Sequence, residues 1–399
     1  MKKHQNSWVL GVSIALLVGC GNASDAGQAE VAPAVATPAA TDASPAMTTA
    51  SGFDTTEVMQ FDAPWAMTFL PDGRLLVTEK SGALRLFDPA SGRAGDISGV
   101  PAVVNRGQGG FGDVLLHPQY ASNGAVYISY VEAGDDGKTG AVVARGTLAL
   151  DEQGGGALTD VETIWVQNPK QEGDGHFGHR IAFDGEGKLW ISSSERQKFD
   201  PAQDMTGNLG KMLRLNDDGS VPADNPFADR DDVGAQVWSL GHRNILGLAF
   251  DANGQLWAHE MGPKGGDELN RIEKGANYGY PIVSDGDHYD GRPIPDHDTR
   301  PEFATPAVTW TQVISPAGFV IYSGDLFPAW RGNGFIGGLS SKALVRIAFD
   351  GEGASEAQRY PMDRRIREVE QGPDGALWLL EDGGTKGEGW LLKLTPTGA

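Results

Sequence analysis

Two histidines lie in the glycine-rich segment Gly-His-Phe-Gly-His-Arg at residues 175–180, and an apolar strand pattern leads from this segment to Glu195. A histidine can act as a general base when a carboxylate holds one ring nitrogen and the other nitrogen is free to take a proton. His176 and Glu195 could form such a pair at the two ends of the strand, and His179 is a second candidate base. A single loop histidine can equally cap a turn, so this segment has to be weighed with the others.

Four more segments combine glycines and polar residues in predicted loops, where binding and catalytic residues are most common. The glycines of the first segment allow the backbone to approach a flat ligand closely, although such a run is also typical of a turn. The segments are Gly-Gln-Gly-Gly-Phe-Gly at 107–112; Gly-His-Arg-Asn at 241–244; Glu-Met-Gly-Pro at 260–263, with Asp267, Glu268 and Asn-Tyr-Gly-Tyr-Pro at 277–281; and Lys342 with Arg-Arg-Ile-Arg at 364–367.

The last of these segments gathers cations in an acidic chain. The 399 residues include 53 Asp and Glu against 32 Lys and Arg, a formal net charge of -21, which argues against nucleic acid as a partner. Arg365 and Arg367 alternate about Ile366 on a predicted strand, so both side chains project to one face and can meet carboxylates in a bidentate manner. The alternative is that these cations only solvate the surface.

The elements that must position these segments are short strands. The chain has 56 Gly and 23 Pro and few long helical patterns. One unit recurs six times: an apolar strand, a turn often of the Pro-Asp-Gly or Asn-Gly type, and an alternating apolar strand. Asp-Gly and Asn-Gly supply the positive φ values of tight hairpin turns. The predicted hairpins span residues 66–78, 114–129, 181–192, 248–259, 319–337 and 369–380.

This recurrence predicts an all-β fold, a six-bladed β-propeller with four-stranded antiparallel blades over residues 52–399. Each hairpin buries one face only, so the six need mutual burial, which radial blades provide. A two-sheet sandwich with hairpin insertions is the alternative, but it explains neither the even recurrence nor the long loops. In a propeller the functional loops gather at one end of the axis, so the five polar segments are expected to converge there.

The N-terminal residues 1–20 are typical of an export signal: Lys2 and Lys3 precede an apolar run too short to span a bilayer. The run ends in Leu-Val-Gly-Cys, which resembles the lipobox of bacterial lipoproteins, and predicts lipidation of Cys20, the chain's only cysteine. An ordinary signal peptide with an incidental cysteine is the alternative. Residues 21–51 are rich in Ala, Pro and Thr and are predicted to be a flexible tether. Gly21, rather than Asp, points to the outer membrane, so we expect a periplasmic protein held to the membrane only by its lipid.

Taken together and in this order, the polar segments resemble the soluble pyrroloquinoline-quinone-dependent sugar dehydrogenases, the glucose/sorbosone dehydrogenase family, and especially its aldose dehydrogenase branch. The matching stretch runs over about residues 64–393. The resemblance implies oxidation of aldose sugars at C1 to the lactone, with bound pyrroloquinoline quinone (PQQ) and Ca²⁺. The electron acceptor stays unidentified; a periplasmic cytochrome or a membrane quinone is suggested by compartment alone.

The resemblance also implies a role for each matching residue. His176 would be the base, Glu195 its partner and Arg243 the cation at the quinone carbonyl. The cofactor would be bound by Gln108, Arg243, Asn244, Lys342, Arg365 and Arg367; calcium by the carbonyl groups of Gly262 and Pro263; a second, structural calcium by Asp267, Glu268 and Tyr278; and the sugar by Gln108, His176 and Trp310. Solvated acidic loop residues are the alternative for the second calcium site, and core packing is the alternative for Trp310.

Two positions depart from the best-described soluble glucose dehydrogenase of the family: Glu195 stands in place of Asp, and Met261 in place of Gln. Two rival functions are a calcium-dependent lactonase, which would not explain the cations Lys342, Arg365 and Arg367, and a non-enzymatic surface-binding propeller, which would need no catalytic histidine. The segment 283–306, rich in Asp and His, could be a lid or a dimer contact or have no role.

Overall fold

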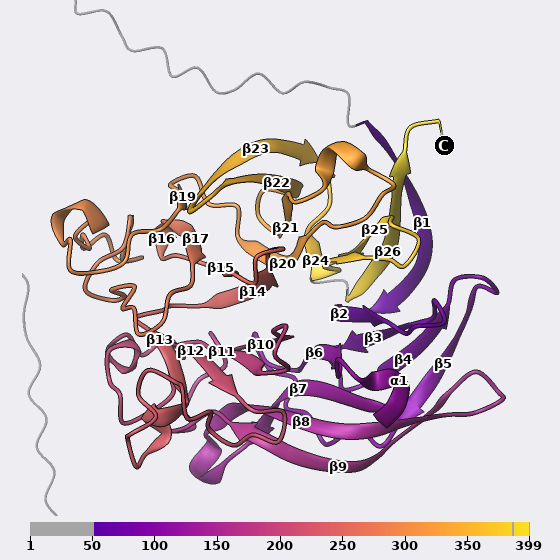
Figure 1. The fold of residues 1–399 in the computed structure, drawn as a ribbon, viewed down its shortest axis with the longest axis horizontal. Helices are drawn as coiled ribbons and strands as arrows, with labels where there is room; N and C mark the ends of the chain where they lie inside the picture. Colours follow the sequence, from indigo (N-terminus) through magenta and orange to yellow (C-terminus); the bar gives the residue numbers. More distant parts are fainter. Residues whose placement is uncertain (1–51, 385–386, 399) are drawn as a thin grey trace, which may run out of the picture. The chain divides into compact units, whose positions relative to one another are not determined.

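The computed structural model describes residues 52–384 and 387–398, and most of them lie in short strands and turns with few helical residues (Figure 1). The predicted all-β class is therefore confirmed. The predicted signal segment, Cys20 and the tether up to residue 51 lie outside the described residues. Among the described residues, no helix has the length and apolar character that a membrane crossing requires.

The strands follow one another in four-stranded antiparallel runs. The first two runs are β2 (Pro64–Phe69), β3 (Leu75–Glu79), β4 (Leu84–Asp88) and β5 (Arg93–Ser98), then β6 (Phe111–Leu116), β7 (Ala125–Ala133), β8 (Thr139–Leu150) and β9 (Gly156–Val166). A short parallel pairing of β5 with β9 joins these two runs into one eight-stranded sheet.

Three further sheets follow the same order along the chain. They are β10 (Gly178–Phe183), β11 (Leu189–Ser193), β12 (Lys211–Leu215) and β13 (Val237–Leu240); β14 (Ile245–Phe250), β15 (Leu256–Glu260), β17 (Asp267–Arg271) and β19 (Val308–Trp310); and β20 (Pro316–Ile321), β21 (Gly334–Gly338), β22 (Ala343–Asp350) and β23 (Gly353–Pro361). A two-stranded sheet pairs β16 (Lys264–Gly265) with β18 (Gly286–Asp287).

The remaining sheet joins the two ends of the described chain. Its strands β24 (Ile366–Gln371), β25 (Leu377–Glu381) and β26 (Glu388–Pro396) are completed by β1 (Phe53–Asp62), which pairs antiparallel with β26. The helices are short: α1 (Tyr120–Asn123) and the 3₁₀ helices η1 (Asp135–Gly137), η2 (Asp200–Ala202), η3 (Val233–Gln236), η4 (His297–Thr299) and η5 (Pro328–Trp330).

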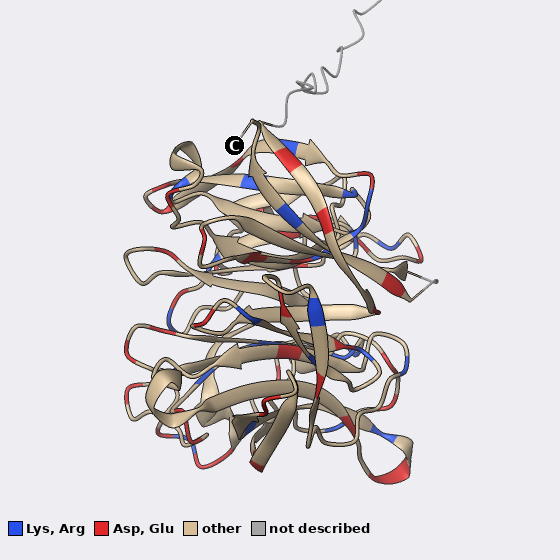
Figure 2. Cartoon of the chain, turned by 90° about the vertical axis from the view of Figure 1, so that its right-hand side faces the viewer, with Lys and Arg blue, Asp and Glu red and all other residues tan. Residues whose placement is uncertain are grey.

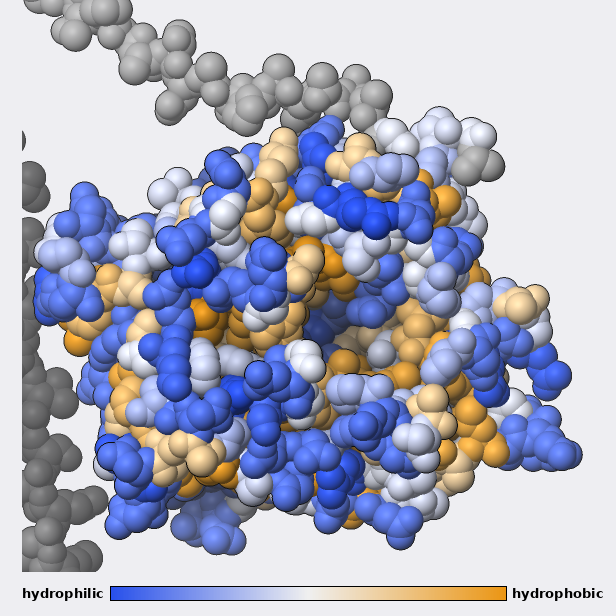
Figure 3. Space-filling model, in the orientation of Figure 1, coloured by the Kyte–Doolittle hydropathy of each residue, from blue (hydrophilic) through white to orange (hydrophobic). Residues whose placement is uncertain are grey.

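All six predicted hairpins are present as antiparallel pairs: β2 with β3, β6 with β7, β10 with β11, β14 with β15, β20 with β21 and β24 with β25. The first strand of each pair contacts the first strands of its two neighbours. These contacts form a closed ring around the centre of the molecule (Figure 1). The face seen in Figure 3 is hollowed near its middle.

The core lies between neighbouring sheets, and the strands are accordingly buried on both faces. In β3, Leu76 packs in one cluster with Ile128 of β7, whereas Leu75 and Val77 point the other way and pack with Leu380 of β25. Successive strand residues face opposite sides, so one strand serves two cores. In Figure 2 charged residues are sparse on the strands and recur in the loops.

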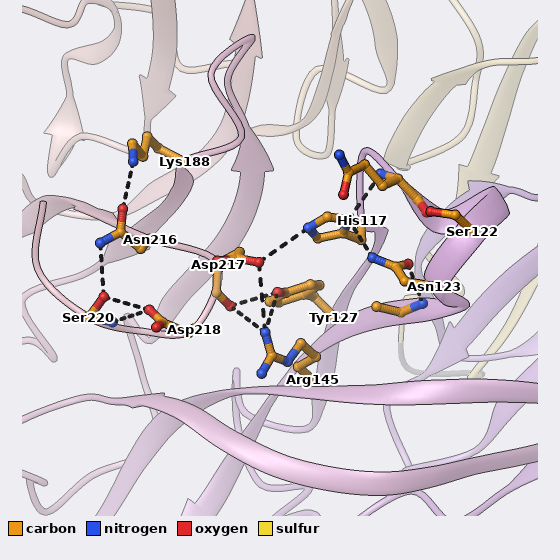
Figure 4. A network of polar contacts seen from close by, with 12 residues as sticks. His117, Ser122, Asn123, Tyr127, Arg145, Lys188, Asn216, Asp217, Asp218 and Ser220 are labelled. Atoms are coloured by element: carbon orange, nitrogen blue, oxygen red, sulfur yellow. Dashed lines mark hydrogen bonds and ion pairs between the residues drawn. The ribbon is translucent and has the colours of Figure 1, made fainter.

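Polar contacts also join neighbouring sheets. The turn after β12 reaches the β7–β8 hairpin: the Tyr127 hydroxyl donates to the Asp217 carbonyl at 2.7 Å, and Arg145 Nη1 donates to the same carbonyl at 3.2 Å (Figure 4). His117 Nε2 lies 3.5 Å from the Asp217 carboxylate, and its Nδ1 bonds Asn123 Nδ2 at 2.9 Å. This network ties the two sheets together through residues that are not among the predicted site residues.

Each of the six inner hairpins has an irregularity in its register near the start of its first strand. A β-bulge of this kind turns side chains out of the regular alternation and is common beside active sites. The residues Trp65, His179, Leu246 and Arg367 lie at four of these irregularities, and all four line one cavity. The bulges are therefore the local feature that directs side chains from separate sheets toward a common space.

Candidate active site

Two cavities hold most of the predicted site residues. The first, here the polar cavity, has a volume of about 370 Å³ and is lined by Gln108, His179, Asn244, Arg365 and Arg367 among others. The second, the aromatic cavity, has a volume of about 250 Å³ and is lined by His176, Glu195, Phe199, Arg243, Pro263, Tyr280 and Tyr289 among others. The cavities are neighbours: Arg243 and Asn244 are consecutive, and the backbone N–H of His176 donates to Gln108 Oε1 at 2.7 Å.

His176 and Glu195 form the predicted pair. Their atoms Nδ1 and Oε1 lie 2.5 Å apart, and both side chains are buried. Glu195 Oε2 accepts the backbone N–H groups of Lys198, at 2.5 Å, and Phe199, at 2.8 Å. Since the carboxylate accepts on both oxygens, Nδ1 of His176 carries the proton, and Nε2 is left as the basic nitrogen.

The protonation of the pair follows from its surroundings. Burial lowers the pKa of His176 below its ordinary value; the Arg243 cation acts in the same direction, and the hydrogen bond to Glu195 opposes both. Burial works against ionisation of Glu195, but the hydrogen bond from His176 and the nearby charges hold its pKa below its usual value. The arrangement therefore favours a neutral imidazole beside an ionised carboxylate at neutral pH.

The backbone around this pair is strained. His176 has φ +48°, and Arg196, Gln197 and Phe199 have φ values from +58° to +64°, in a region that side chains other than glycine rarely adopt. Such residues cost about 1–3 kcal/mol each and persist where the surroundings fix them, which is common at functional sites. The Glu195 carboxylate, with its two backbone donors, is one element that fixes this segment.

Arg243 and Asn244 each have a polar atom with no partner in the described part of the chain. Arg243 Nη1 donates to the Met261 carbonyl at 2.7 Å, but its Nε is buried and makes no hydrogen bond; the same is true of Asn244 Oδ1. Burying a polar atom without a hydrogen bond is costly, so these two atoms are available to bind a polar ligand in the cavities. Both residues line the cavity walls.

The two arginines of the C-terminal cluster share a single carboxylate. Arg365 donates to Asp382 Oδ2 through Nε at 3.0 Å and Nη2 at 2.7 Å, and Arg367 Nη2 donates to the same oxygen at 3.1 Å. Sequence reasoning missed Asp382 and also Lys80, a third cation of the polar cavity. Burial lowers the pKa of Lys80, and Arg367 adds to the effect. The place of Lys80 directly after the strand of the first hairpin could have indicated it.

Of the residues predicted to bind the cofactor or the sugar, Lys342 and Trp310 line neither cavity. Lys342 is exposed, with φ +50°. Trp310 is buried in the core, where its Nε1 donates to Glu356 Oε2 at 2.7 Å, so it has the core position that was its alternative. His179 lies in the polar cavity and has no carboxylate partner among the residues that the structure describes. Its Nδ1 lies 2.8 Å from Ser129 Oγ, and burial lowers its pKa to about 3.

The segment with Gly262 and Pro263 is held by Asp267. The Asp267 carboxylate accepts three backbone N–H groups, from Gly262 at 3.0 Å, from Ile314 at 2.9 Å and from Ser315 at 2.7 Å. A Cβ at Gly262 would lie 2.0 Å from the Gly266 carbonyl oxygen, so only glycine fits this approach. No hydrogen bond to the carbonyl oxygens of Gly262 and Pro263 occurs within residues 52–384 and 387–398.

We expect Asp267→Ala to lower the free energy of unfolding by about 3–5 kcal/mol, because each buried N–H left without an acceptor costs about 1–3 kcal/mol. Denaturant unfolding of the purified variant would measure this. Asp251→Ala is the matched control: Asp251 also accepts two backbone N–H groups, at 2.8 and 3.0 Å, but in a hairpin turn where water can replace it. Equal losses in the two variants would contradict the role given to Asp267.

Of the three residues predicted for the second calcium site, Glu268 is better placed to bind a cation than Asp267 or Tyr278. The three donors already occupy the oxygens of Asp267, and the Tyr278 hydroxyl donates to the Arg271 carbonyl. Burial and the neighbouring Glu260 carboxylate raise the pKa of Glu268, a repulsion that a bound cation would relieve. In the described part of the chain, no group of three or more His, Cys, Asp or Glu side chains is arranged to hold a metal ion.

Comparisons with known proteins agree with this geometry. The Glucose / Sorbosone dehydrogenase family model matches residues 61–393. The chain is 40% identical over 348 residues to the aldose sugar dehydrogenase YliI of Escherichia coli (strain K12), a match that covers 85% of this chain and 92% of that protein.

Solved structures are similar over the same range. The soluble aldose sugar dehydrogenase from Escherichia coli in its apo form has a TM-score of 0.80 and 38% identity, with 86% of this chain and 99% of that chain covered. The PQQ-bound form of an aldose sugar dehydrogenase from Streptomyces coelicolor has a TM-score of 0.69 and 28% identity, with 86% and 98% covered.

Proposed function

The chain belongs to the glucose/sorbosone dehydrogenase family, and from that membership we propose that it oxidises aldose sugars at C1 to the lactone with PQQ as redox cofactor. The observation that carries the proposal is the junction of the two cavities. There a carboxylate-held histidine and a buried arginine line one cavity, and a cluster of cations lines its neighbour.

The polar cavity fits an anionic, planar cofactor. PQQ has three carboxylates, and Lys80, Arg365 and Arg367 supply three cations that have Asp382 between them. Gln108 and the unpartnered Asn244 Oδ1 would bind the ring system. Burial, and to a lesser extent the Arg367 cation, lowers the pKa of Lys80, and an anion bound beside it would stabilise its charged form. When bound, PQQ supplies the acceptor for the hydride that leaves the sugar C1.

The carbonyl groups of Gly262 and Pro263 fit a calcium ion, since Ca²⁺ takes oxygen ligands and these two oxygens have no donor in the described residues. Pro263 lines the aromatic cavity, and the preceding Met261 lines the polar cavity, so an ion on this segment would lie between sugar and cofactor spaces. A second calcium is proposed with the carboxylate of Glu268 as its main ligand, since Asp267 and the Tyr278 hydroxyl already have partners.

His176 is the base of the proposed reaction. Its Nε2 would take the proton from the anomeric hydroxyl, while Glu195 fixes the tautomer and stabilises the imidazolium that forms. Arg243 would stabilise the negative charge that develops where the hydride arrives, because a fixed cation in a water-poor cavity acts strongly and needs no reorganisation. Its backbone N–H and Nη1 bond Glu260 and the Met261 carbonyl, which hold it in place.

The test is reconstitution. The full chain mixed with PQQ and Ca²⁺ is expected to reduce an artificial dye when an aldose is added, and to require both additions. The absence of dye reduction over a broad panel of aldoses would refute the proposal. Lactone hydrolysis with calcium alone would instead support the lactonase, and sugar binding without either reaction would support a binding propeller.

The pH dependence should reflect His176. The neutral imidazole is the active form, so kcat/KM is expected to be constant at neutral pH and to fall only as the pH drops through a pKa below the ordinary 6.5. Glu195→Gln removes the negative charge that raises this pKa, so the acid limb of the variant should move to still lower pH. Initial-rate profiles of both proteins would measure this, and an acid limb above pH 7 in the wild type would contradict the assignment.

The finer architecture and location are proposed on other grounds. A six-bladed propeller is supported by the six inner strands, each of which begins a four-stranded antiparallel run. Export, lipidation of Cys20, an outer-membrane location on the periplasmic side, and a periplasmic cytochrome or quinone as electron acceptor rest on the N-terminal sequence pattern alone. Incorporation of labelled palmitate into wild type but not Cys20→Ser would test the anchor.

A further inference from the structure

Exposed aromatic side chains gather at the aromatic cavity. Among the described residues, the exposed large hydrophobic side chains are Phe199 at 42%, Val221 at 37%, Ile282 at 38% and Tyr289 at 75%. Two of these four, Phe199 and Tyr289, line the cavity that contains His176. Grouped apolar side chains left open to water mark a binding surface more often than scattered ones do.

Phe199 is held rigidly relative to the proposed base. Its backbone has φ +64°, and its N–H donates to Glu195 Oε2 at 2.8 Å, the carboxylate that also holds His176. Its ring lies against those of Tyr280 and His288, with centroids 6.3 and 5.6 Å away. Core packing does not explain this strained backbone, because the Phe199 ring that it positions is 42% exposed.

Tyr289 comes to the cavity from another segment. Its ring lies 5.9 Å from the Arg243 guanidinium carbon, which lies 5.8 Å from the ring of Tyr280. The stem of its loop is anchored by the pairing of Gly286 with Gly265, which follows closely after Pro263. The segment 283–306, for which the sequence alone left the role open, thus provides one wall of the cavity.

We propose that Phe199 and Tyr289 are the specificity-determining walls of the sugar site, which stack on the apolar C–H face of an aldopyranose ring and hold its C1 beside His176; this rests on the proposed function. A pyranose ring presents C–H groups on its faces and hydroxyl groups around its edge. Aromatic walls with a few polar groups at the rim suit such a ligand. The rim here carries Gln197, Asp290 and Arg292.

The variants Phe199→Ala and Tyr289→Ala test the proposal in the reconstituted enzyme. Each is expected to raise KM for D-glucose about tenfold with kcat changed less than about twofold, because stacking binds the ring without taking part in proton transfer. Tyr289→Phe keeps the ring and should keep the wild-type KM. Val221→Ala is the matched control, since Val221 is similarly exposed but lines neither cavity.

Saturation-transfer NMR with D-glucose and the full chain without added cofactor gives a second, turnover-independent measurement. Transfer to the ring C–H protons is expected for wild type and Val221→Ala, and a strong loss is expected in both alanine variants of the walls. Unchanged KM and unchanged transfer in those variants, or no transfer to wild type, would overturn the proposal.

The two measurements separate this inference from the proposed function. If saturation transfer depends on Phe199 and Tyr289 but the chain oxidises no aldose, the sugar site is supported and the dehydrogenase activity is refuted. Oxidation of aldoses with the same KM in all variants would support the dehydrogenase and refute the role of Phe199 and Tyr289 as walls of the sugar site.

Discussion

Replacing His176 by alanine is expected to lower kcat for aldose oxidation by about 10²- to 10⁴-fold, the usual cost of losing a general base. Cofactor binding should persist, because the cations proposed to bind PQQ line the neighbouring cavity. Dye-coupled turnover at saturating sugar, together with a titration of bound PQQ, would measure both quantities.

His117→Gln is the control for this variant. His117 is also a buried histidine with a carboxylate near its ring, but it belongs to the contact between sheets and lines neither cavity. Its kcat should match the wild type. A His176→Ala enzyme that loses PQQ but turns over normally once saturated with it would show that His176 binds the cofactor and is not the base.

Replacing Arg243 by leucine is expected to lower kcat by about 10²- to 10³-fold, the range found when one donor to a developing oxyanion is removed. Lysine should restore only part of the rate, since an ammonium group cannot reproduce the planar fork that bonds the Met261 carbonyl and leaves Nε toward a ligand. The measurement is kcat at saturating sugar and cofactor.

Arg145→Gln provides the comparison for Arg243. Arg145 is partly buried and bonds a backbone carbonyl as Arg243 does, but in the contact between sheets. The Arg145→Gln variant is therefore expected to keep the wild-type kcat. A leucine variant at position 243 with unchanged kcat and raised KM would assign Arg243 to sugar binding instead of charge stabilisation.

The hairpins could be predicted from sequence because their determinants are local. Turns such as Asp-Gly and Asn-Gly fix the backbone over a few residues, and the flanking alternation fixes which face is buried. The pairing of β1 with β26 was not predicted, since its two strands lie at opposite ends of the described chain and no turn joins them. The short parallel contact of β5 with β9 was not predicted either, because three strands separate these two in the sequence and no turn joins them.

Site residues could be predicted where the residue type itself indicates a chemical role. His176 and Glu195 are brought together as expected, and Arg365 and Arg367 share a face, as the alternation about Ile366 predicts. Lys80 and the aromatic walls were missed. Lys80 follows directly after a predicted strand, so its place could have indicated it, whereas Tyr289 lies in a long loop that a strand pattern does not place.

Through the antiparallel pairing of Phe53–Asp62 with Glu388–Pro396, the first and last strands of the described residues belong to one sheet. Release of β1 would leave β26 as a bare edge strand, able to accept the same segment from a second copy. The pairing of β1 with β26 therefore also covers an edge that a second copy could otherwise use to form a strand-exchanged dimer.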